Sequence, residues 1–204
     1  MCAVLSRADR QARTRSELID AGERLFIANG FHATSIDAVA AEAGYTKGAV
    51  YSNFASKEDL FFAIYERRVE RRGAEMRSAI ESAPTARAAL EQIIPGGSAH
   101  TPSGDGWLAV FFEFWAHVLR HPELRERFAE LHGRVIGPLA EGVERLAREE
   151  GYELADDPSK LATARYAMQL GLQLERLTRP ELVDAELALR VTRFFTDEGG
   201  RDGI

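Results

Sequence analysis

Hydrophobic residues recur every three or four positions along most of the chain, which is the spacing of amphipathic helices. Residues 13–29 follow this spacing, and Gly30 is suited to the positive φ at which many helices end. A short second helix is predicted from an N-cap at Thr34 to Gly44. Almost no stretch alternates between apolar and polar residues as a half-buried strand does. The pattern therefore predicts an all-α protein.

The next stretch, KGAVYSNF at residues 47–54, differs because most of its residues are polar or small. A helix this short is marginal by itself in water, so its neighbours have to hold it. Val50 and Phe54 are suited to that anchoring, and Thr46 is a suitable N-cap. The other side chains are left to face outward, which raises the question of what they contact.

Six further helices are predicted, at 57–82, 86–94, 106–121, 122–150, 158–177 and 181–197. Ser56 is a suitable N-cap for the first of them. Residues 95–105 are rich in Gly and Pro and are therefore predicted to form a loop. Gly137 and Pro138 should kink or break the helix over 122–150, because proline removes a backbone hydrogen bond and clashes with the preceding turn. The chain is thus predicted to form about nine helices, with a three-helix head and a larger helical body.

The composition is that of a soluble globular protein, since 45% of the 204 residues are hydrophobic and 28% are charged. No stretch approaches the ~18 consecutive apolar residues of a membrane helix. Cys2 is the single cysteine, so no disulfide can form within the chain. These features predict a cytoplasmic protein without a membrane partner.

The net charge of −6 argues at first against a nucleic-acid partner, but the charge is unevenly distributed. Residues 1–57 carry seven Lys and Arg against six Asp and Glu, whereas the remainder carries 19 against 26. An acidic body with a locally basic N-terminal part suits a small nucleic-acid module joined to a larger domain. Ordinary scatter of charges is the alternative explanation.

Ala40, Gly44 and Val50 have the spacing of a helix-turn-helix. Ala40 lets two helices cross closely, Gly44 tolerates the positive φ of a tight turn, and Val50 anchors the second helix. In that motif the second helix lies in the major groove of DNA. Its outward residues would be Thr46, Lys47, Tyr51, Ser52 and Asn53. Gly48 would let the backbone approach phosphates near the helix N-terminus. By itself the spacing also fits an ordinary helical hairpin.

The wider segment 18–65 strongly resembles the N-terminal domain of the tetracycline-repressor (TetR) family. The matching residues are Ala21, Phe26, Gly30, Phe31, Thr34, Ser35, Ile36, Val39, Ala40, Ala43, Gly44, Lys47, Gly48, Tyr51, Phe54, Lys57, Glu58 and Leu60. The sequence departs from the family's pattern at Ser52, where a second aromatic residue is frequent, and at Asn53, where histidine is common. Both departures bear on which DNA sequence is recognised.

The resemblance implies a homodimeric transcription regulator, usually a repressor that a small ligand releases from DNA. It implies a DNA-binding head at 1–56 and a ligand-binding and dimerisation domain at 57–204. By position, the residues that look like phosphate contacts are Thr34, Ser35, Tyr51 and Lys57. Those that would meet base edges or nearby backbone are Thr46, Lys47, Gly48, Ser52 and Asn53. The basic arm 1–15 either adds DNA contacts or is a disordered, solvated segment.

The helix predicted over 106–121 is apolar on nearly its whole circumference, so it should be buried on all sides. It is either a plain core helix or a wall of a ligand cavity. In the second case the candidate ligand-binding residues are Trp107, Phe111, Phe114, Trp115, His117, His132, Gln169 and Gln173. The predicted effector is then a small apolar or aromatic molecule. By resemblance, the helices over 158–177 and 181–197 form the dimer interface, and a dimer predicts a palindromic double-stranded DNA operator.

Several alternatives stay open at this point. Glu113, His117 and His121 recur every four residues on one helix face and could bind a metal ion, although no fourth ligand is evident. An activator, a regulator without a ligand, or a helical adaptor that does not bind DNA would share most of these patterns. An enzyme is not expected, because we find no Gly-rich phosphate loop and no Ser-His-Asp arrangement in context. No cofactor is expected.

Overall fold

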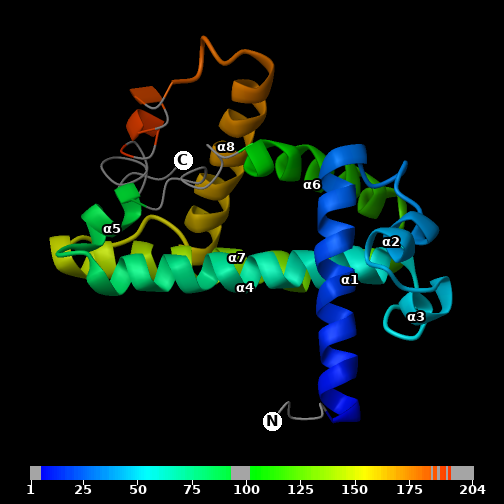
Figure 1. Ribbon diagram of the computed structural model, residues 1–204. Coiled ribbons are helices and arrows are strands. Elements are labelled where there is room, and N and C mark those ends of the chain that lie inside the picture. Colours follow the sequence, from blue (N-terminus) through cyan, green and yellow to red (C-terminus); the bar gives the residue numbers. More distant parts are fainter. Residues whose placement is uncertain (1–5, 93–101, 185, 188, 192, 194–204) are drawn as a thin grey trace. The chain divides into compact units, whose positions relative to one another are not determined.

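A computed structural model describes residues 6–92, 102–184, 186, 187, 189–191 and 193. These residues contain eight helices with described bounds, further helical residues between 186 and 193, and no strand, which confirms the predicted all-α fold. The helices are α1 (Arg7–Asn29), α2 (Ile36–Glu42), α3 (Lys47–Tyr51), α4 (Lys57–Ser82), α5 (Ala86–Gln92), α6 (Pro102–Arg120), α7 (Pro122–Glu150) and α8 (Pro158–Thr178) (Figure 1). None of these helices combines the length and apolar character needed to span a bilayer.

The chain divides into two compact units. Unit 1 consists of Met1–Arg68 and Gly106–Phe128, and unit 2 of Val69–Asp105 and Ala129–Ile204. Unit 1 therefore holds α1, α2 and α3, the first part of α4, most of α6 and the start of α7. Unit 2 holds the rest of α4 and α7 together with α5 and α8. The functional boundary between residues 56 and 57 stays a prediction.

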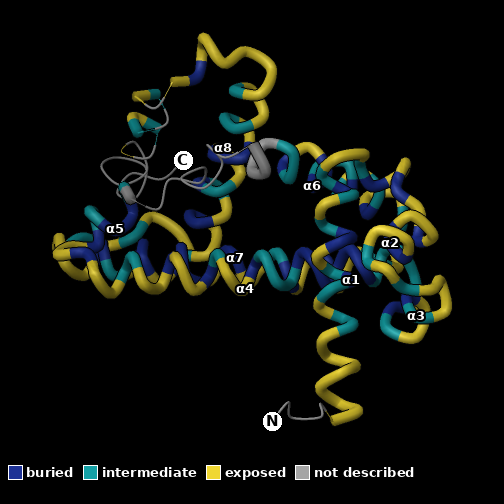
Figure 2. Tube along the Cα trace, viewed as in Figure 1, coloured by how far each residue is buried: buried dark blue, intermediate teal, exposed yellow. Residues whose placement is uncertain are grey.

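Helix α1 begins earlier than its apolar pattern predicts, because Ser6 and Asp9 form a capping box. The Asp9 N–H donates to Ser6 Oγ at 3.1 Å, and the Ser6 N–H donates to the Asp9 carboxylate at 3.1 Å. Of the predicted arm, residues 7–15 are thus helical rather than disordered, while 1–5 lie outside the described residues. The first turns are mostly exposed, and the first buried residue of α1 is Leu18 (Figure 2).

The N-cap of α2 is Ser35 and not Thr34, which corrects the prediction. Ser35 Oγ accepts a hydrogen bond from the Ala38 N–H at 3.1 Å. The Thr34 hydroxyl instead points back to the end of α1, where the carbonyl oxygens of Gly30 and Leu25 lie at 2.8 and 3.2 Å. By residue type, Thr34 and Ser35 are both suitable N-caps. Because the two carbonyl groups engage the Thr34 hydroxyl, Ser35 is the residue that caps α2.

Pro138 does not break α7, so of the two predicted outcomes the break is wrong and the kink stays a prediction. The helix runs from Pro122 to Glu150 with Pro138 inside it. The neighbours Ile136, Leu139 and Ala140 are buried in a core cluster of unit 2. A proline inside a helix costs ~3 kcal/mol or more, whereas fully burying one large apolar side chain contributes about 1.5–3 kcal/mol. Packing on both sides of Pro138 therefore offsets its cost.

Two other helices compare with their predicted ranges as follows. Helix α5 is described as far as Gln92, and the last two residues of its predicted range, 93 and 94, lie outside the described residues. Helix α6 already includes Pro102, four residues before its predicted start at 106. Residues 181–184 are not helical, whereas 186, 187, 189–191 and 193 are. The rest of the helix predicted over 181–197 lies outside the described residues.

Candidate nucleic-acid interface

Helices α2 and α3 form a helix-turn-helix built on the three residues whose spacing predicts it. Ala40 is 3% exposed and Val50 is fully buried, so both pack inward. Gly44 has φ 72° in the turn, and the Tyr45 N–H donates to the Ala40 carbonyl oxygen at 2.8 Å. The turn therefore requires the conformational freedom of glycine at position 44.

The outward face of α3 is polar. Its N-cap is Thr46, whose Oγ1 accepts from the Ala49 N–H at 3.3 Å, as predicted. The exposed residues on this face are Thr46, Lys47, Gly48, Tyr51 and Ser52. Tyr51 is the largest of them, with half of its surface exposed, while Val50 and Phe54 are buried beneath. The polar side chains of this segment thus face solvent, and its apolar side chains pack inward.

Lys47 forms an exposed ion pair across the motif. Its Nζ lies 2.9 Å from Asp37 Oδ2, and this hydrogen bond and charge raise the pKa of Lys47. Exposed ion pairs contribute little net stability, because water and salt screen them. A phosphate group can therefore replace Asp37 as the partner of Lys47 at low cost.

Ser52 and Asn53 make hydrogen bonds within their own segment. The Ser52 hydroxyl donates to the Ala49 carbonyl oxygen at 2.9 Å, and Asn53 Nδ2 donates to the same oxygen at 2.8 Å. Both side chains thereby cap the end of α3. Asn53 Nδ2 carries two protons, and the one that is not bound to Ala49 has only Ser52 Oγ nearby, at 3.4 Å, so it can be donated to a base.

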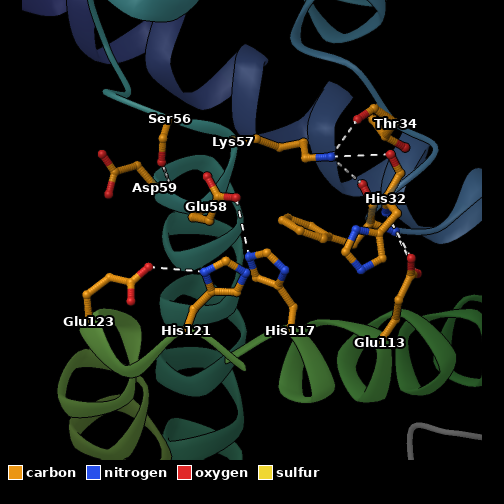
Figure 3. A network of polar contacts seen from close by, with 11 residues as sticks. His32, Thr34, Ser56, Lys57, Glu58, Asp59, Glu113, His117, His121 and Glu123 are labelled. Atoms are coloured by element: carbon orange, nitrogen blue, oxygen red, sulfur yellow. Dashed lines mark hydrogen bonds and ion pairs between the residues drawn. The ribbon is translucent and has the colours of Figure 1, made fainter. Parts of the chain in front are cut away.

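The ammonium group of Lys57 binds backbone carbonyl groups of the protein. Its Nζ donates to the carbonyl oxygens of Phe31, His32 and Thr34 at 2.9, 3.3 and 3.2 Å, and lies 4.4 Å over the Phe31 ring (Figure 3). Thr34 is only 3% exposed. Of the four residues that resemble phosphate contacts, Lys57 and Thr34 hold the loop between α1 and α2, whereas Ser35 and Tyr51 are exposed.

Glu113 of α6 holds the same loop through its N–H groups. Its Oε2 accepts from the Phe31 N–H at 2.7 Å, and its Oε1 accepts from the His32 N–H at 2.9 Å (Figure 3). Sequence reasoning considered Glu113 as a metal ligand and did not predict this contact with the loop. No local pattern could reveal a contact between residues about 80 positions apart.

The three side chains considered for metal binding have separate partners. His117 Nε2 lies 3.5 Å from Glu58 Oε1, and His121 Nδ1 lies 3.1 Å from Glu123 Oε1, while Glu113 binds the loop (Figure 3). In the described part of the chain, no group of three or more His, Cys, Asp or Glu side chains could hold a metal ion. The metal-responsive alternative is therefore not supported.

Aromatic residues of α6 lie in the core of unit 1, but the prediction that this helix is buried on all sides is wrong, because Leu119 is 59% exposed. Phe114 is fully buried and stacks on Phe61 with ring centroids 3.9 Å apart. Phe111 is 3% exposed and lies 5.3 Å from the Tyr65 ring, centroid to centroid. Trp107 stacks on Phe61 at 5.4 Å. These contacts favour the core interpretation of the aromatic helix for Phe111 and Phe114.

The remaining aromatic candidates also lie in unit 1. The Trp115 ring packs 5.2 Å from Phe128, and the His117 ring packs 5.1 Å from Phe31. His132, Gln169 and Gln173 instead lie in unit 2. The predicted ligand-binding set is therefore divided between the two units.

Unit 2 contains a half-buried polar side chain on α7 and buried ones on α8. Gln169 is 1% exposed, and the His132 ring lies 5.3 Å from that of Tyr166. Burial lowers the pKa of His132 and raises that of Tyr166 to about 12. Sequence reasoning missed Arg165, which is 2% exposed and donates from Nη2 to the Leu90 carbonyl oxygen at 2.7 Å.

The position of Arg165 in the helical pattern was an available signal. It lies four residues after Leu161 and four before Gln169, and all three are buried on α8. Burial, followed by the charge of Arg72, lowers the pKa of Arg165 to about 10. A charged residue in the middle of a buried helix face is unusual and needs a polar partner, which the Leu90 carbonyl oxygen supplies here.

Comparison with known families agrees with the helix-turn-helix geometry. The sequence model described as "Bacterial regulatory proteins, tetR family" matches residues 18–64. The model described as "BetI-type transcriptional repressor, C-terminal" matches residues 84–199, which is more than half of the chain. The chain belongs to the TetR family. As a TetR-family member it is a DNA-binding transcriptional regulator, and α3 is the second helix of its helix-turn-helix.

Individual relatives extend this agreement along the chain. The HTH-type transcriptional regulator UidR of Escherichia coli (strain K12) is 28% identical over 157 residues, which are 77% of each chain. A solved transcriptional regulator from Saccharomonospora viridis, in complex with choline, has a TM-score of 0.73 at 19% identity and covers 92% of this chain and 97% of its own. FadR from Bacillus subtilis, in complex with stearoyl-CoA, has a TM-score of 0.67 at 17% identity. The match covers 93% of this chain and 98% of the FadR chain. The likeness of the two structures establishes a shared TetR fold.

Proposed function

We propose that this TetR-family regulator is a homodimeric repressor that leaves a palindromic DNA operator when a small organic molecule binds its C-terminal domain. The observation that carries the proposal is the exposed polar face of α3. Thr46, Lys47 and Tyr51 stand on it above the buried anchor Val50. The proposed role is regulatory and not catalytic.

The exposed residues of the head are proposed to contact DNA directly. Ser35 and Tyr51 are assigned to phosphates, which fix register and give salt dependence. The residues assigned to base edges or nearby backbone are Thr46, Lys47, Gly48, Ser52 and Asn53. Lys57 and Thr34 are proposed to contribute to DNA binding by holding the loop before Ser35, because their side chains already bind its carbonyl groups.

The dimer is proposed to form through α8 and the helix that follows it. Large apolar side chains of α8 are exposed in the single chain: Met168 by 41%, Leu174 by 45% and Leu177 by 37%. Covering such residues with a second copy of the chain removes apolar surface from water. Two copies related by a two-fold axis would present two recognition helices to a palindromic operator.

The effector is proposed to bind in unit 2, in contact with His132, Gln169 and Gln173. Convergent polar groups in largely apolar surroundings are typical of small-molecule sites. Two solved structures of the same fold hold choline and stearoyl-CoA, which are organic molecules with apolar parts. A small molecule with an apolar or aromatic part is therefore the proposed class of effector.

The test of this function uses labelled duplexes that tile the DNA flanking the protein's own gene. Fluorescence anisotropy should find one duplex that is bound far more tightly than unrelated DNA, with two chains per site. A compound that raises the melting temperature of the protein in a screen of small organic molecules should then release that duplex. Equal binding to all duplexes would contradict DNA-specific regulation, and stabilising compounds that leave the complex intact would contradict ligand release.

A further inference from the structure

Helix α6 belongs to one part of the chain by its family match and to another part by its packing. By sequence it lies within the C-terminal family match at residues 84–199, outside the N-terminal match at 18–64. By structure, Gly106–Phe128 belongs to the compact unit that also contains α1, α2 and α3. Any side chain of α6 that binds the helix-turn-helix therefore makes the DNA-binding head depend on a helix of the C-terminal segment.

Glu113 is such a side chain, and its contact is specific. Each of its two carboxylate oxygens accepts one backbone N–H, from Phe31 at 2.7 Å and from His32 at 2.9 Å. Hydrogen bonds with an ionised partner are about twice as strong as those between neutral groups. The two carboxylate oxygens thereby fix the direction of two consecutive peptide groups.

Lys57 completes the clamp on this loop. While Glu113 binds N–H groups, the Lys57 ammonium binds the carbonyl oxygens of Phe31, His32 and Thr34 at 2.9, 3.3 and 3.2 Å (Figure 3). The loop between α1 and α2 is thus held by an anion from α6 and a cation from α4. The residue after this clamp is Ser35, the N-cap of α2.

The packing around Glu113 leaves it little freedom. Gly30 has φ 87°, and a Cβ atom placed on it would lie 2.7 Å from Glu113 Oε2. The Phe31 ring packs against Phe114 at 5.0 Å and Phe61 at 5.6 Å. The carboxylate therefore lies directly against the backbone at the end of α1, with the aromatic core of unit 1 beside it.

We propose that Glu113 is a positioning residue through which α6 fixes the α1–α2 loop in the form that presents Ser35 and α3 to DNA. A displacement of α6 withdraws the carboxylate, frees two N–H groups and loosens the loop. This inference rests on the proposed function for its effect on DNA, whereas the clamp itself can be measured without DNA.

The test compares the full-length parent with Glu113→Gln and Glu113→Ala, and with Glu123→Gln as a control that removes the same charge from an exposed site. Amide hydrogen exchange of Phe31 and His32 is measured by NMR in the free protein and with the operator duplex. Operator affinity is measured by anisotropy, and folding by thermal melting. Should Glu113→Ala fail to fold, Glu113→Gln keeps the size of the side chain and carries the test.

In the parent, both amides should exchange slowly although His32 is exposed. In Glu113→Gln, at least one should exchange faster, and operator affinity should fall about tenfold for the loss of a charge-assisted hydrogen bond. The faster exchange should be confined to this loop in the free variant, whereas a general loss of stability would speed exchange throughout the fold and lower the melting temperature. The operator should restore slow exchange in the variant. Glu123→Gln should match the parent.

Fast exchange of both amides in the parent would overturn the clamp, and unchanged operator affinity in Glu113→Gln would overturn its role in DNA binding. If the parent itself binds no duplex specifically, the proposed function fails, and the exchange measurement still decides whether Glu113 holds the loop.

Discussion

Arg15 of α1 donates a hydrogen bond from Nη1 to the backbone carbonyl oxygen of Asn53, at 2.8 Å. The same guanidinium lies 4.4 Å over the ring of Phe54. These two contacts join α1 to residues that lie shortly after α3. Arg15, which the sequence places in a basic arm, therefore supports α3 from within the protein.

Replacing Arg15 with alanine should lower the free energy of unfolding by about 1.5–3 kcal/mol, the range for removing a hydrogen bond from a charged group. Arg15→Lys should recover only part of this, because an ammonium lacks the planar guanidinium that covers the Phe54 ring. Urea unfolding followed by circular dichroism measures the effect. Arg10→Ala, at an exposed position of the same helix, is the control, and an equal loss in both variants would contradict the supporting role of Arg15.

When DNA binds, Lys47 is expected to leave its exposed ion pair with Asp37 and to contact a DNA phosphate instead. Lys47→Ala should reduce the slope of log affinity against log salt concentration by about 0.9 for each phosphate that is no longer neutralised, and thus about 1.8 per dimer. The measurement is operator affinity over a series of salt concentrations. Lys160→Ala, which removes an exposed lysine from α8, should leave the slope unchanged. An unchanged slope in Lys47→Ala would show that this lysine meets no phosphate.

Gly30→Ala should be more damaging than Gly151→Ala, although both glycines end a helix with positive φ. At Gly151 no atom lies within 4 Å of a new Cβ, so only backbone strain of about 1–2 kcal/mol is expected. At Gly30 the strain is joined by a contact with Glu113 Oε2 at 2.7 Å, which has to move. We expect a total loss of about 2–4 kcal/mol in urea unfolding. Equal losses at the two sites would contradict the close packing of Glu113.

The stability of the protein should depend on pH through His117. Burial lowers the pKa of His117 from its ordinary value of 6.5, the charge of His121 lowers it further, and Glu58 acts in the opposite direction. The unfolded chain then binds the proton more readily than the folded protein does. The free energy of unfolding should therefore fall as pH decreases below about 6.5 and towards the lower folded pKa.

The matching experiment is urea unfolding between pH 5 and 8 for the parent and His117→Gln. The variant should show a shallower decline below about pH 6.5, because it has no proton to take up at this site. A residual decline is expected from His132, whose pKa burial also lowers. The carboxylate of Glu123 contributes only at lower pH, since its pKa is lowered from 4.5. Identical slopes for parent and variant would contradict the effect of His117.

The exposed apolar residues of α8 should mark the dimer interface. Leu174→Arg should convert the dimer to a monomer at micromolar concentration, since a charge would replace an apolar contact in the proposed interface. Sedimentation velocity measures the change. Leu119→Arg is the matched control, because Leu119 of α6 is also exposed, by 59%. Monomer formation by both variants, or by neither, would contradict an interface on α8.

Local patterns predicted most of the helices because their ends carry their own signals. Ser56 caps α4, Gly44 supplies a positive φ, and Asp157 caps α8 just before Pro158. The bounds of α4 agree with the prediction at both ends. Pro138 shows the limit of such rules, because the burial of its neighbours in a core that includes other helices offsets the cost of the proline, and the helix continues.

The polar face of α3 was likewise predictable, since each residue there could be compared with its own neighbours. The contacts that hold the α1–α2 loop could not be predicted in this way. Glu113 and Lys57 reach the loop from two helices far along the chain, and nothing in their local sequence distinguishes them from exposed charges. Phe111 and Phe114 show the same difficulty, because a helix that is apolar all round indicates burial but does not say what surrounds it.

The central claim, that the exposed face of α3 meets DNA, is tested most directly by operator affinity of the double variant Lys47→Ala, Tyr51→Ala against the parent. Both side chains are exposed, so thermal melting should stay close to that of the parent. The account predicts that the variant binds the operator at least about tenfold more weakly at low salt, because each head then lacks two side chains that meet DNA directly. An affinity equal to that of the parent, with the fold intact, would contradict it.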